Sequence, residues 1–197
     1  MTFWDIIAPV YDIFELSKKG QIAEKICELT PQGANVLELA SGTGDIALAV
    51  SKKAGRVLCT DISENMLKTA KRKVKKHGVN NISFDKISIF ETGRHDNSFD
   101  VVIASQILHL LNDPEIACKE IRRVAKNAVF LVIPMLKEAT PFRNILIRFY
   151  KLFGFDPKRK LDRNSCKVFL EEMGFVNCEY YIIKSATSSC IAVWKKN

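Results

Sequence analysis

The sequence predicts a doubly wound α/β fold of three layers, in which helices cover both faces of a mostly parallel sheet. Two observations indicate this fold. Short apolar segments alternate with helical patterns over most of the 197 residues, and the chain closes with two β segments that have no helix between them. The expected strands are Val36–Leu39, Arg56–Thr60, Asn81–Asp85, Asp100–Ala104 and Ala128–Ile133, followed by a hairpin of Val176–Lys184 and Thr187–Lys195.

Capping and breaking residues mark the ends of the expected helices. Thr30–Gly33 ends the first helix, Ser63 can cap the helix after the second strand, and Asp113 can cap a later one. Near the end of the chain, Asn164-Ser165 should begin a short helix that Gly174 terminates.

Length and composition are those of one domain, 1–197, with an N-terminal helical cap over 1–30 and a helical lid insertion over 137–163. The opening Met1–Asp5 has neither the basic nor the apolar region of a signal peptide, and no apolar run nears the roughly 18 residues that span a bilayer, so we expect a cytoplasmic protein. The six cysteines form no CxxC or Cys/His cluster, which predicts reduced thiols and no metal site.

The net charge of +8 favours anionic partners without identifying them. The densest basic run falls on an expected helix and comprises Lys68, Lys71, Arg72, Lys73, Lys75 and Lys76. A solvated outer face explains it better than a nucleic-acid site, because no aromatic residues lie between the charges. An RNA-binding or RNA-modifying protein stays open as an alternative.

The most informative stretch is Val36–Leu48, in which a short apolar strand is followed by a glycine-containing turn and an amphipathic helix. Gly42 and Gly44 permit a ligand to approach the backbone closely, and N–H groups of the turn would face that ligand. Asp61 lies seventeen residues after Gly44, at the end of the next strand, where a carboxylate can accept both hydroxyls of a ribose. These residues predict a nucleoside-binding site.

Two classes of cofactor contain such a nucleoside. The segment Gly42–Ala47 satisfies the dinucleotide pattern GxGxx(G/A), which alone is a weak signal. Glu38 favours the other class, because a carboxylate inside the first strand would repel a pyrophosphate and attract the ammonium and sulfonium of S-adenosylmethionine. We therefore expect S-adenosylmethionine as the cofactor, with S-adenosylhomocysteine as its product, and an NAD-dependent oxidoreductase as the alternative.

Three segments resemble signature segments of the class I S-adenosylmethionine-dependent methyltransferase family: Glu38–Gly44, Asp61 after its apolar strand, and Ser98–Ser105. The resemblance covers nearly the whole chain and implies a Rossmann-like sheet of seven strands with the last one antiparallel. The short opening Trp4–Asp12 is similar to the start of the quinone-biosynthesis and phospholipid methyltransferase branch. The resemblance implies a methyltransferase.

It also implies positions for the cofactor-binding residues. Gly42 and Gly44 would line the methionine portion and Asp61 would hold the ribose. The other implied contacts are Ile62, Met66, Ser88 and Ile89 around the adenine, Ser105 and Gln106 below the sulfonium, and Tyr11 above it. Ile62, Met66 and Ile89 could instead be ordinary core residues, and Tyr11 could simply pack an N-terminal helix.

Two positions depart from the family pattern. Ala40 replaces the first glycine of the turn and is among the implied cofactor-binding residues, and we expect it to be tolerated if its φ is negative. Ser88 stands where many members place an acid for the adenine amino group, so a hydroxyl or a backbone group must serve there.

The segment after the fourth strand bears on the methyl acceptor. Ala104–Ile107 lacks the (Asp/Asn)-Pro-Pro-(Tyr/Phe) sequence of members that methylate nucleobases and glutamine, which favours a small molecule, lipid-like or quinone-like. His109 is the candidate base if the acceptor must lose a proton, and packing in the following turn is its alternative role. Thr140–Phe153, apolar on one face and basic on the other, could cover the acceptor, contact an anionic membrane or pack on the sheet.

Overall fold

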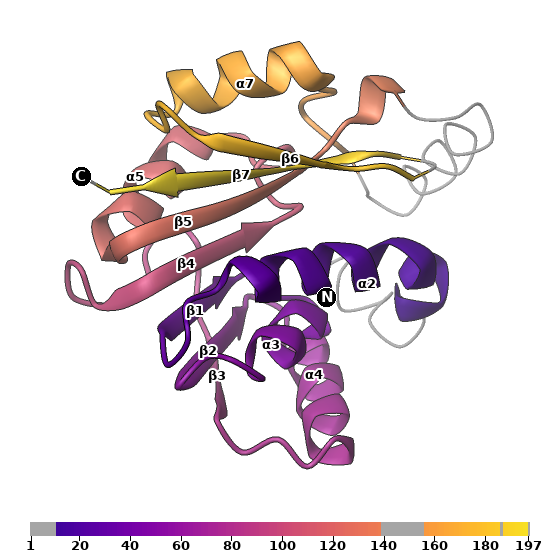
Figure 1. The fold of residues 1–197 in the computed structure, drawn as a ribbon, viewed down its shortest axis with the longest axis vertical. Helices are drawn as coiled ribbons and strands as arrows, with labels where there is room; N and C mark the ends of the chain where they lie inside the picture. Colours follow the sequence, from indigo (N-terminus) through magenta and orange to yellow (C-terminus); the bar gives the residue numbers. More distant parts are fainter. Residues whose placement is uncertain (1–10, 139–155, 186, 197) are drawn as a thin grey trace.

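A computed structural model describes residues 11–138, 156–185 and 187–196, and Figure 1 shows its ribbon. The described part contains one seven-stranded sheet with the strand order β3-β2-β1-β4-β5-β7-β6. Neighbouring strands are parallel except at β5·β7 and β6·β7, so β7 runs against the others. The predicted doubly wound sheet with a closing antiparallel hairpin is confirmed.

The strands begin and end within three residues of the ranges expected from the sequence. They are β1 (Asn35–Leu39), β2 (Arg56–Asp61), β3 (Ile82–Lys86), β4 (Phe99–Ser105), β5 (Ala125–Pro134), β6 (Glu179–Ile183) and β7 (Ser189–Lys195). The helices are α2 (Tyr11–Leu29), α3 (Asp45–Val50), α4 (Glu64–Lys76), α5 (Pro114–Val124) and α7 (Arg163–Glu172), with a 3-10 turn η1 (Leu136–Glu138).

Buried apolar side chains form two clusters, one on each face of the sheet. One cluster packs α2, α3 and α4 against the sheet through residues such as Ile26, Ala47 and Ala70. The other packs α5 and α7 through residues such as Ile121 and Leu170. The central strands are buried on both sides, which explains their nearly continuous apolar sequences. Figure 1 shows α2, α3 and α4 on one side of the sheet and α5 and α7 on the other.

The helix ends partly follow the expected signals. Ser63 caps α4, since its hydroxyl accepts the Met66 N–H at 3.2 Å. Asp113 precedes α5 as expected, but the expected side-chain cap is wrong: no such hydrogen bond forms, and its ψ of 69° is not the extended value of most N-caps. Pro114 at the first position instead favours the helical φ without needing a partner for an N–H.

Helix α7 begins slightly before its expected start at Asn164-Ser165. Asp162 is its N-cap and forms a capping box: its carboxylate accepts the Ser165 N–H at 2.9 Å, and the Ser165 hydroxyl accepts the Asp162 N–H at 2.9 Å. Gly174, with a φ of +83°, follows the helix end as predicted.

Some sequence-based expectations fall outside the described residues. These include residues 1–10 of the N-terminal cap, the side chain of Tyr11 and residues 139–155 of the proposed lid insertion. Among the helices that the structure describes, none combines the length and apolar character that crossing a membrane requires.

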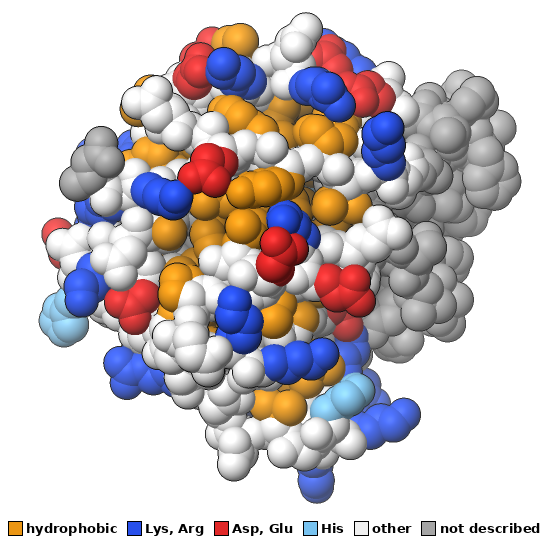
Figure 2. Space-filling view, viewed as in Figure 1, with side chains coloured by type: hydrophobic (Ala, Val, Ile, Leu, Met, Phe, Trp, Pro, Cys, Tyr) orange, Lys and Arg blue, Asp and Glu red, His pale blue; other side chains and the backbone are white. Residues whose placement is uncertain are grey.

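Basic and acidic side chains are interspersed on the face of the molecule that Figure 2 shows. Figure 2 shows lysine and arginine side chains spread over this face with acidic ones between them. On α4, the basic residues at 68, 71, 72, 75 and 76 are exposed, in agreement with a solvated face, whereas Lys73 is only partly exposed. The six cysteines are free thiols, four of them buried.

Candidate functional site

The strand order reverses at β1, and this reversal determines where a ligand can bind. β1 pairs with β2 on one side and with β4 on the other, so the connections after β1 and β4 diverge from neighbouring strand ends. A doubly wound sheet opens a crevice at such a point, outside the carboxyl ends of the strands. The glycine turn after β1 and the segment after β4 lie at this crevice.

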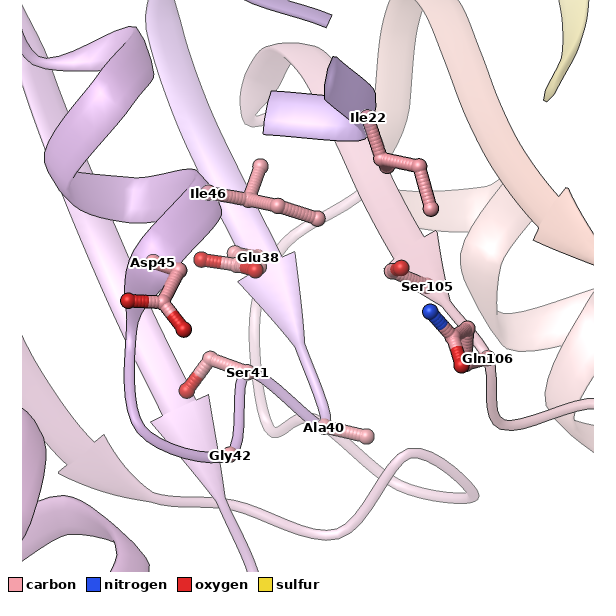
Figure 3. A pocket seen from close by; sticks show the side chains of 9 residues that line it. All are labelled: Ile22, Glu38, Ala40, Ser41, Gly42, Asp45, Ile46, Ser105 and Gln106. Atoms are coloured by element: carbon pink, nitrogen blue, oxygen red, sulfur yellow. The ribbon is translucent and has the colours of Figure 1, made fainter. Parts of the chain in front are cut away.

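A first cavity of about 460 Å³ lies beside the glycine turn and is shown in Figure 3. Glu38 and Asp45 give this cavity two carboxylates, and Glu38 is only 1% exposed. In Figure 3 these two side chains and Ser41 lie on one side of the cavity, opposite Ser105 and Gln106. The remaining lining residues are Ile22, Ala40, Gly42 and Ile46. The cavity therefore has an acidic wall and suits a cationic group.

A second cavity of about 480 Å³ lies beyond the same turn and is mostly apolar. Asp61 provides its carboxylate at the end of β2. Ile62, 60% exposed, and Met66, 1% exposed, line it together with Ile107 and Leu110. Apolar walls with one carboxylate suit a flat ring joined to a polyhydroxylated sugar.

Four residues line both cavities: Ala40, Gly42, Ser105 and Gln106. The cavities are therefore two ends of one elongated site, with an acidic end at Glu38 and an apolar end at Ile62. Eight of the residues expected from the sequence to bind the cofactor come together here. The eight are Glu38, Ala40, Gly42, Asp61, Ile62, Met66, Ser105 and Gln106.

The turn has a backbone that favours glycine at three places. Gly42 has φ +55° and Gly44 φ +76°, and Ala40 has φ +52°. The condition under which alanine would be tolerated at position 40, a negative φ, is therefore not met. Its left-handed conformation carries a strain of about 1–2 kcal/mol for a residue with a Cβ. The surrounding hydrogen bonds hold the turn in this shape, because the next amide, Ser41 N–H, donates to the Thr60 carbonyl at 2.9 Å.

Asp61 joins the turn to the start of α4. One carboxylate oxygen accepts the Gly42 N–H at 2.8 Å, and the other accepts the Ser63 N–H at 2.8 Å. Asp61 is only 7% exposed, so these charge-assisted bonds fix its position. The same carboxylate faces the second cavity and is placed to accept hydroxyl groups from a ligand there.

Gly44 has a second reason to be glycine. A Cβ at this position would lie 3.0 Å from the Cβ of Ala70 and 3.6 Å from the Cys59 Sγ. The turn is thus pressed against α4 on the side away from the cavities. The expected contact of Gly44 with a methionine portion stays a prediction, whereas its contact with α4 accounts for the residue type.

Cys59 lies behind the turn as a buried thiol. Burial raises the pKa of Cys59, and the nearby Glu38 carboxylate raises it further. The thiol therefore keeps its proton and donates to the Ser41 hydroxyl at 3.0 Å. This contact supports the turn and is structural.

Lys73 reaches the turn from α4. Its ammonium forms an ion pair with the Asp45 carboxylate and donates to the Thr43 hydroxyl at 3.2 Å. Asp45 also accepts from Thr43 at 3.3 Å. The residues on either side of Gly44 are therefore connected to one lysine of a neighbouring helix.

The segment after β4 forms the opposite wall. Gln106 has φ +55°, and its N–H donates to the Val132 carbonyl at 2.8 Å, which ties the turn to β5. His109 follows in the next turn, 3% exposed, and its carbonyl accepts the N–H groups of Lys158 and Arg159 at 3.0 and 3.2 Å. Its role as a base stays a prediction.

Two further expected residues lie after β3. The Ser88 hydroxyl accepts the Phe90 N–H at 3.2 Å and so stabilises a local turn. Ile89 is 8% exposed and belongs to the buried cluster beneath α5 and α7. Their contact with an adenine is a prediction, and the structure gives each of them a local packing or turn role.

The sequence analysis missed several residues that line the site. Ser41, Asp45 and Ile46 belong to the glycine motif itself, and the motif pattern could have indicated them. Ile107 and Leu110 follow Gln106, which was identified. Ile22 comes from α2, and no local pattern distinguishes it from the core residues of that helix.

No metal centre accompanies this site in the part of the chain that the structure describes, since no three His, Cys, Asp or Glu side chains gather closely enough there to bind an ion.

Comparisons with known proteins agree with this geometry. Residues 31–146 match a family described as a methyltransferase domain. A ubiquinone/menaquinone biosynthesis C-methyltransferase UbiE of Psychromonas ingrahamii is 31% identical over 141 residues, covering 70% of this chain and 55% of that protein. The UbiE of Klebsiella pneumoniae is 28% identical over 181 residues, covering 79% of this chain and 71% of that protein. The chain thus spans about half the length of the Psychromonas relative.

Solved structures share the fold. A SAM-dependent methyltransferase from Aquifex aeolicus matches with a TM-score of 0.66 and 21% identity, covering 93% of each chain. The magnesium protoporphyrin IX methyltransferase of Synechocystis, solved with bound SAH, matches with a TM-score of 0.68 and 17% identity, covering 90% of this chain and 83% of that one. At these identities the matches bear on the fold alone.

Proposed function

The chain belongs to the methyltransferase domain family, and from this premise we propose that it transfers a methyl group from S-adenosylmethionine to a small, quinone-like or lipid-like molecule. The class I, S-adenosylmethionine-dependent methyltransferase that the sequence predicted is confirmed at the level of family, fold and enzyme class. The residues that hold the cofactor, and the acceptor, belong to the proposal.

One observation carries the proposal: the two cavities form a single site whose charge pattern fits this cofactor. The acidic wall of Glu38 and Asp45 suits an ammonium and a sulfonium. Asp61 is placed for the ribose hydroxyls and Ile62 and Met66 for the adenine. A dinucleotide would bring its pyrophosphate against the same acidic wall, which opposes the NAD-dependent alternative.

The residues of the chain act by binding and orienting. When bound, S-adenosylmethionine would supply a methyl group on a positively charged sulfur: the acceptor would bond to the methyl carbon as the carbon–sulfur bond breaks, and S-adenosylhomocysteine would leave. Ser105 and Gln106 line both cavities and would contact the cofactor where its amino-acid and adenosine parts meet. Alignment of two reactants can lower a barrier by up to ~7–11 kcal/mol, so this chemistry needs no metal or covalent intermediate.

A small apolar acceptor is supported by the residues that follow β4. Ala104–Ile107 lacks the sequence typical of nucleobase and glutamine methylation, which favours a small-molecule acceptor. The printed names of the relatives refer to ubiquinone and menaquinone biosynthesis, which agrees with a quinone-like acceptor. Contact with an anionic membrane through the basic segment after Thr140 is part of the same proposal.

Calorimetry with S-adenosylhomocysteine tests the cofactor site. We expect the wild type to bind it, and Asp61→Ala and Asp61→Asn to bind it about 10–100-fold more weakly, since a charged hydrogen-bonding group contributes about 1.5–3 kcal/mol. Asp85→Ala is the matched control, because Asp85 is an exposed acid on the next strand and pairs with Arg94. The proposal would be refuted if the wild-type protein did not bind S-adenosylhomocysteine but bound NADH.

The acceptor is tested with radiolabelled S-adenosylmethionine. Purified protein is incubated separately with a reduced benzoquinone, a reduced naphthoquinone, anionic phospholipid vesicles and an RNA pool. Label transfer to a quinol or lipid is the expected result. Transfer to RNA alone would replace the small-molecule part of the proposal with the RNA-modifying alternative.

A further inference from the structure

Helix α4 faces the glycine turn with two residues one turn apart. Ala70 allows the close approach of Gly44, and Lys73, three residues later on the same face, extends its ammonium to Asp45 and Thr43. The other lysines and arginines of the basic run on this helix are exposed to solvent. Lys73 is thus the member of that run that reaches the site.

Lys73 changes the charge of the acidic end. Glu38 and Asp45 both line the first cavity, and Lys73 pairs with Asp45 while its own side chain is 18% exposed and that of Asp45 29%. The three groups together carry one net negative charge. Without Lys73 the two carboxylates would together carry two.

This difference affects a ligand that has charges of both signs. The amino-acid end of S-adenosylhomocysteine carries an ammonium and a carboxylate a few ångströms apart. Glu38 attracts the ammonium, whereas Asp45 without its ion pair to Lys73 would repel the carboxylate more strongly. A wall with one net negative charge accepts the zwitterion, and a wall with two favours a ligand that has only the ammonium.

We propose that Lys73 is a specificity-determining positioning residue, which balances the charge of Asp45 so that the cavity accepts a zwitterionic amino-acid group. The inference rests on the proposed function, because it specifies how the same site recognises its cofactor. Lys73 acts through Asp45 and needs no contact with the ligand.

Calorimetry with three ligands tests this. S-adenosylhomocysteine carries both charges, its decarboxylated analogue S-adenosyl-3-thiopropylamine carries only the ammonium, and 5′-methylthioadenosine carries neither. For Lys73→Met, we expect affinity for S-adenosylhomocysteine to fall about 5- to 20-fold, the size of one partly screened charge. Affinity for the decarboxylated ligand should stay equal or rise, and that for 5′-methylthioadenosine should stay equal.

Two further variants complete the experiment. Lys73→Met combined with Asp45→Asn should regain most of the lost affinity for S-adenosylhomocysteine, because the unbalanced carboxylate is removed with its partner. Lys75→Met is the matched control, with the same substitution at an exposed position of the same helix, and should bind all three ligands like the wild type.

The outcomes separate this inference from the proposed function. Equal weakening of all three ligands by Lys73→Met would mean that the lysine only supports the turn, and would overturn the inference. So would a double variant that fails to recover. A wild type that binds none of the three ligands would instead overturn the proposed function, whatever Lys73 does.

Discussion

Gly44→Ala isolates the contact between the glycine turn and helix α4. The added methyl group lowers the free energy of unfolding in two ways. The left-handed φ of +76° is strained for alanine by about 1–2 kcal/mol. The new Cβ would also stand 3.0 Å from the Ala70 Cβ, and such overpacking typically costs about 1–3 kcal/mol. We expect a total loss of about 2–4 kcal/mol in the free energy of unfolding, the sum of these two ranges allowing for some relaxation.

Urea denaturation followed by circular dichroism measures this loss, and the chain offers a matched control. Gly33 has nearly the same φ, +75°, but no atom within 4 Å of its would-be Cβ. Gly33→Ala should therefore show the backbone strain alone, about 1–2 kcal/mol. The difference between the two variants estimates the contact with α4.

A double-mutant cycle with Ala70→Gly checks that the difference has this origin. Removing the Ala70 methyl group costs about 1 kcal/mol as a glycine in a helix, but it should make Gly44→Ala cheaper by about 1 kcal/mol or more. If Gly44→Ala destabilises no more than Gly33→Ala, or if Ala70→Gly leaves its cost unchanged, the close approach of turn and helix does not determine the residue type at 44.

Two other predictions concern stability away from this contact. Ala40→Gly should raise the free energy of unfolding by about 1 kcal/mol in urea denaturation, because glycine adopts the φ of +52° without strain; a loss of stability would contradict the reading of the turn as strained. Hydrogen bonds from Arg123 and Thr92 lower the pKa of Glu120 from 4.5 to about 2. Its stabilisation is thus complete above pH 4.5 and lost as the pH falls through about 2. Glu120→Gln should be about 1–3 kcal/mol less stable than wild type at pH 7, and the gap should narrow between pH 4.5 and 2; a gap that does not change with pH would contradict it.

The fold could be predicted because its signals are local. Each central strand is buried on both faces and reads as a short apolar run, and Ser63 and Gly174 mark helix ends with their own chemistry. The ends shifted by up to three residues because pairing with a neighbouring strand extends or shortens a strand beyond its apolar run. Asp162 was not predicted as a cap, because the third residue of the helix, Ser165, is not the Glu or Gln that usually completes a capping box.

Residues that line the centre of the site were predicted, but most of the contacts that hold the glycine turn from β2 and α4 were not. Glu38, Gly42 and Asp61 carry a pattern that the chemistry of a nucleoside explains from sequence alone. The φ of Ala40 could not be foreseen, because hydrogen bonds to β2 impose it on the turn. Lys73 belonged to a basic run whose helical periodicity indicates a solvated face, and its partner Asp45 lies 28 residues away.

The contacts behind the glycine turn, most of which the sequence did not predict, show that the shape of the site depends on the elements packed around it. Apart from the short turn itself, the groups that hold the glycine turn come from β2 and α4: Thr60 and Asp61 bind its N–H groups, Cys59 and Ala70 pack behind it, and Lys73 pairs with Asp45. A turn of this sequence outside the folded sheet would have none of these partners and no reason to keep three residues at positive φ. Ligand binding should therefore stabilise the packing of α4 on β1 and β2 as well as the turn, since whatever binds the folded state alone adds to its stability. It follows that amide hydrogen exchange in α4 should slow when S-adenosylhomocysteine binds, although most of that helix lies behind the cavities.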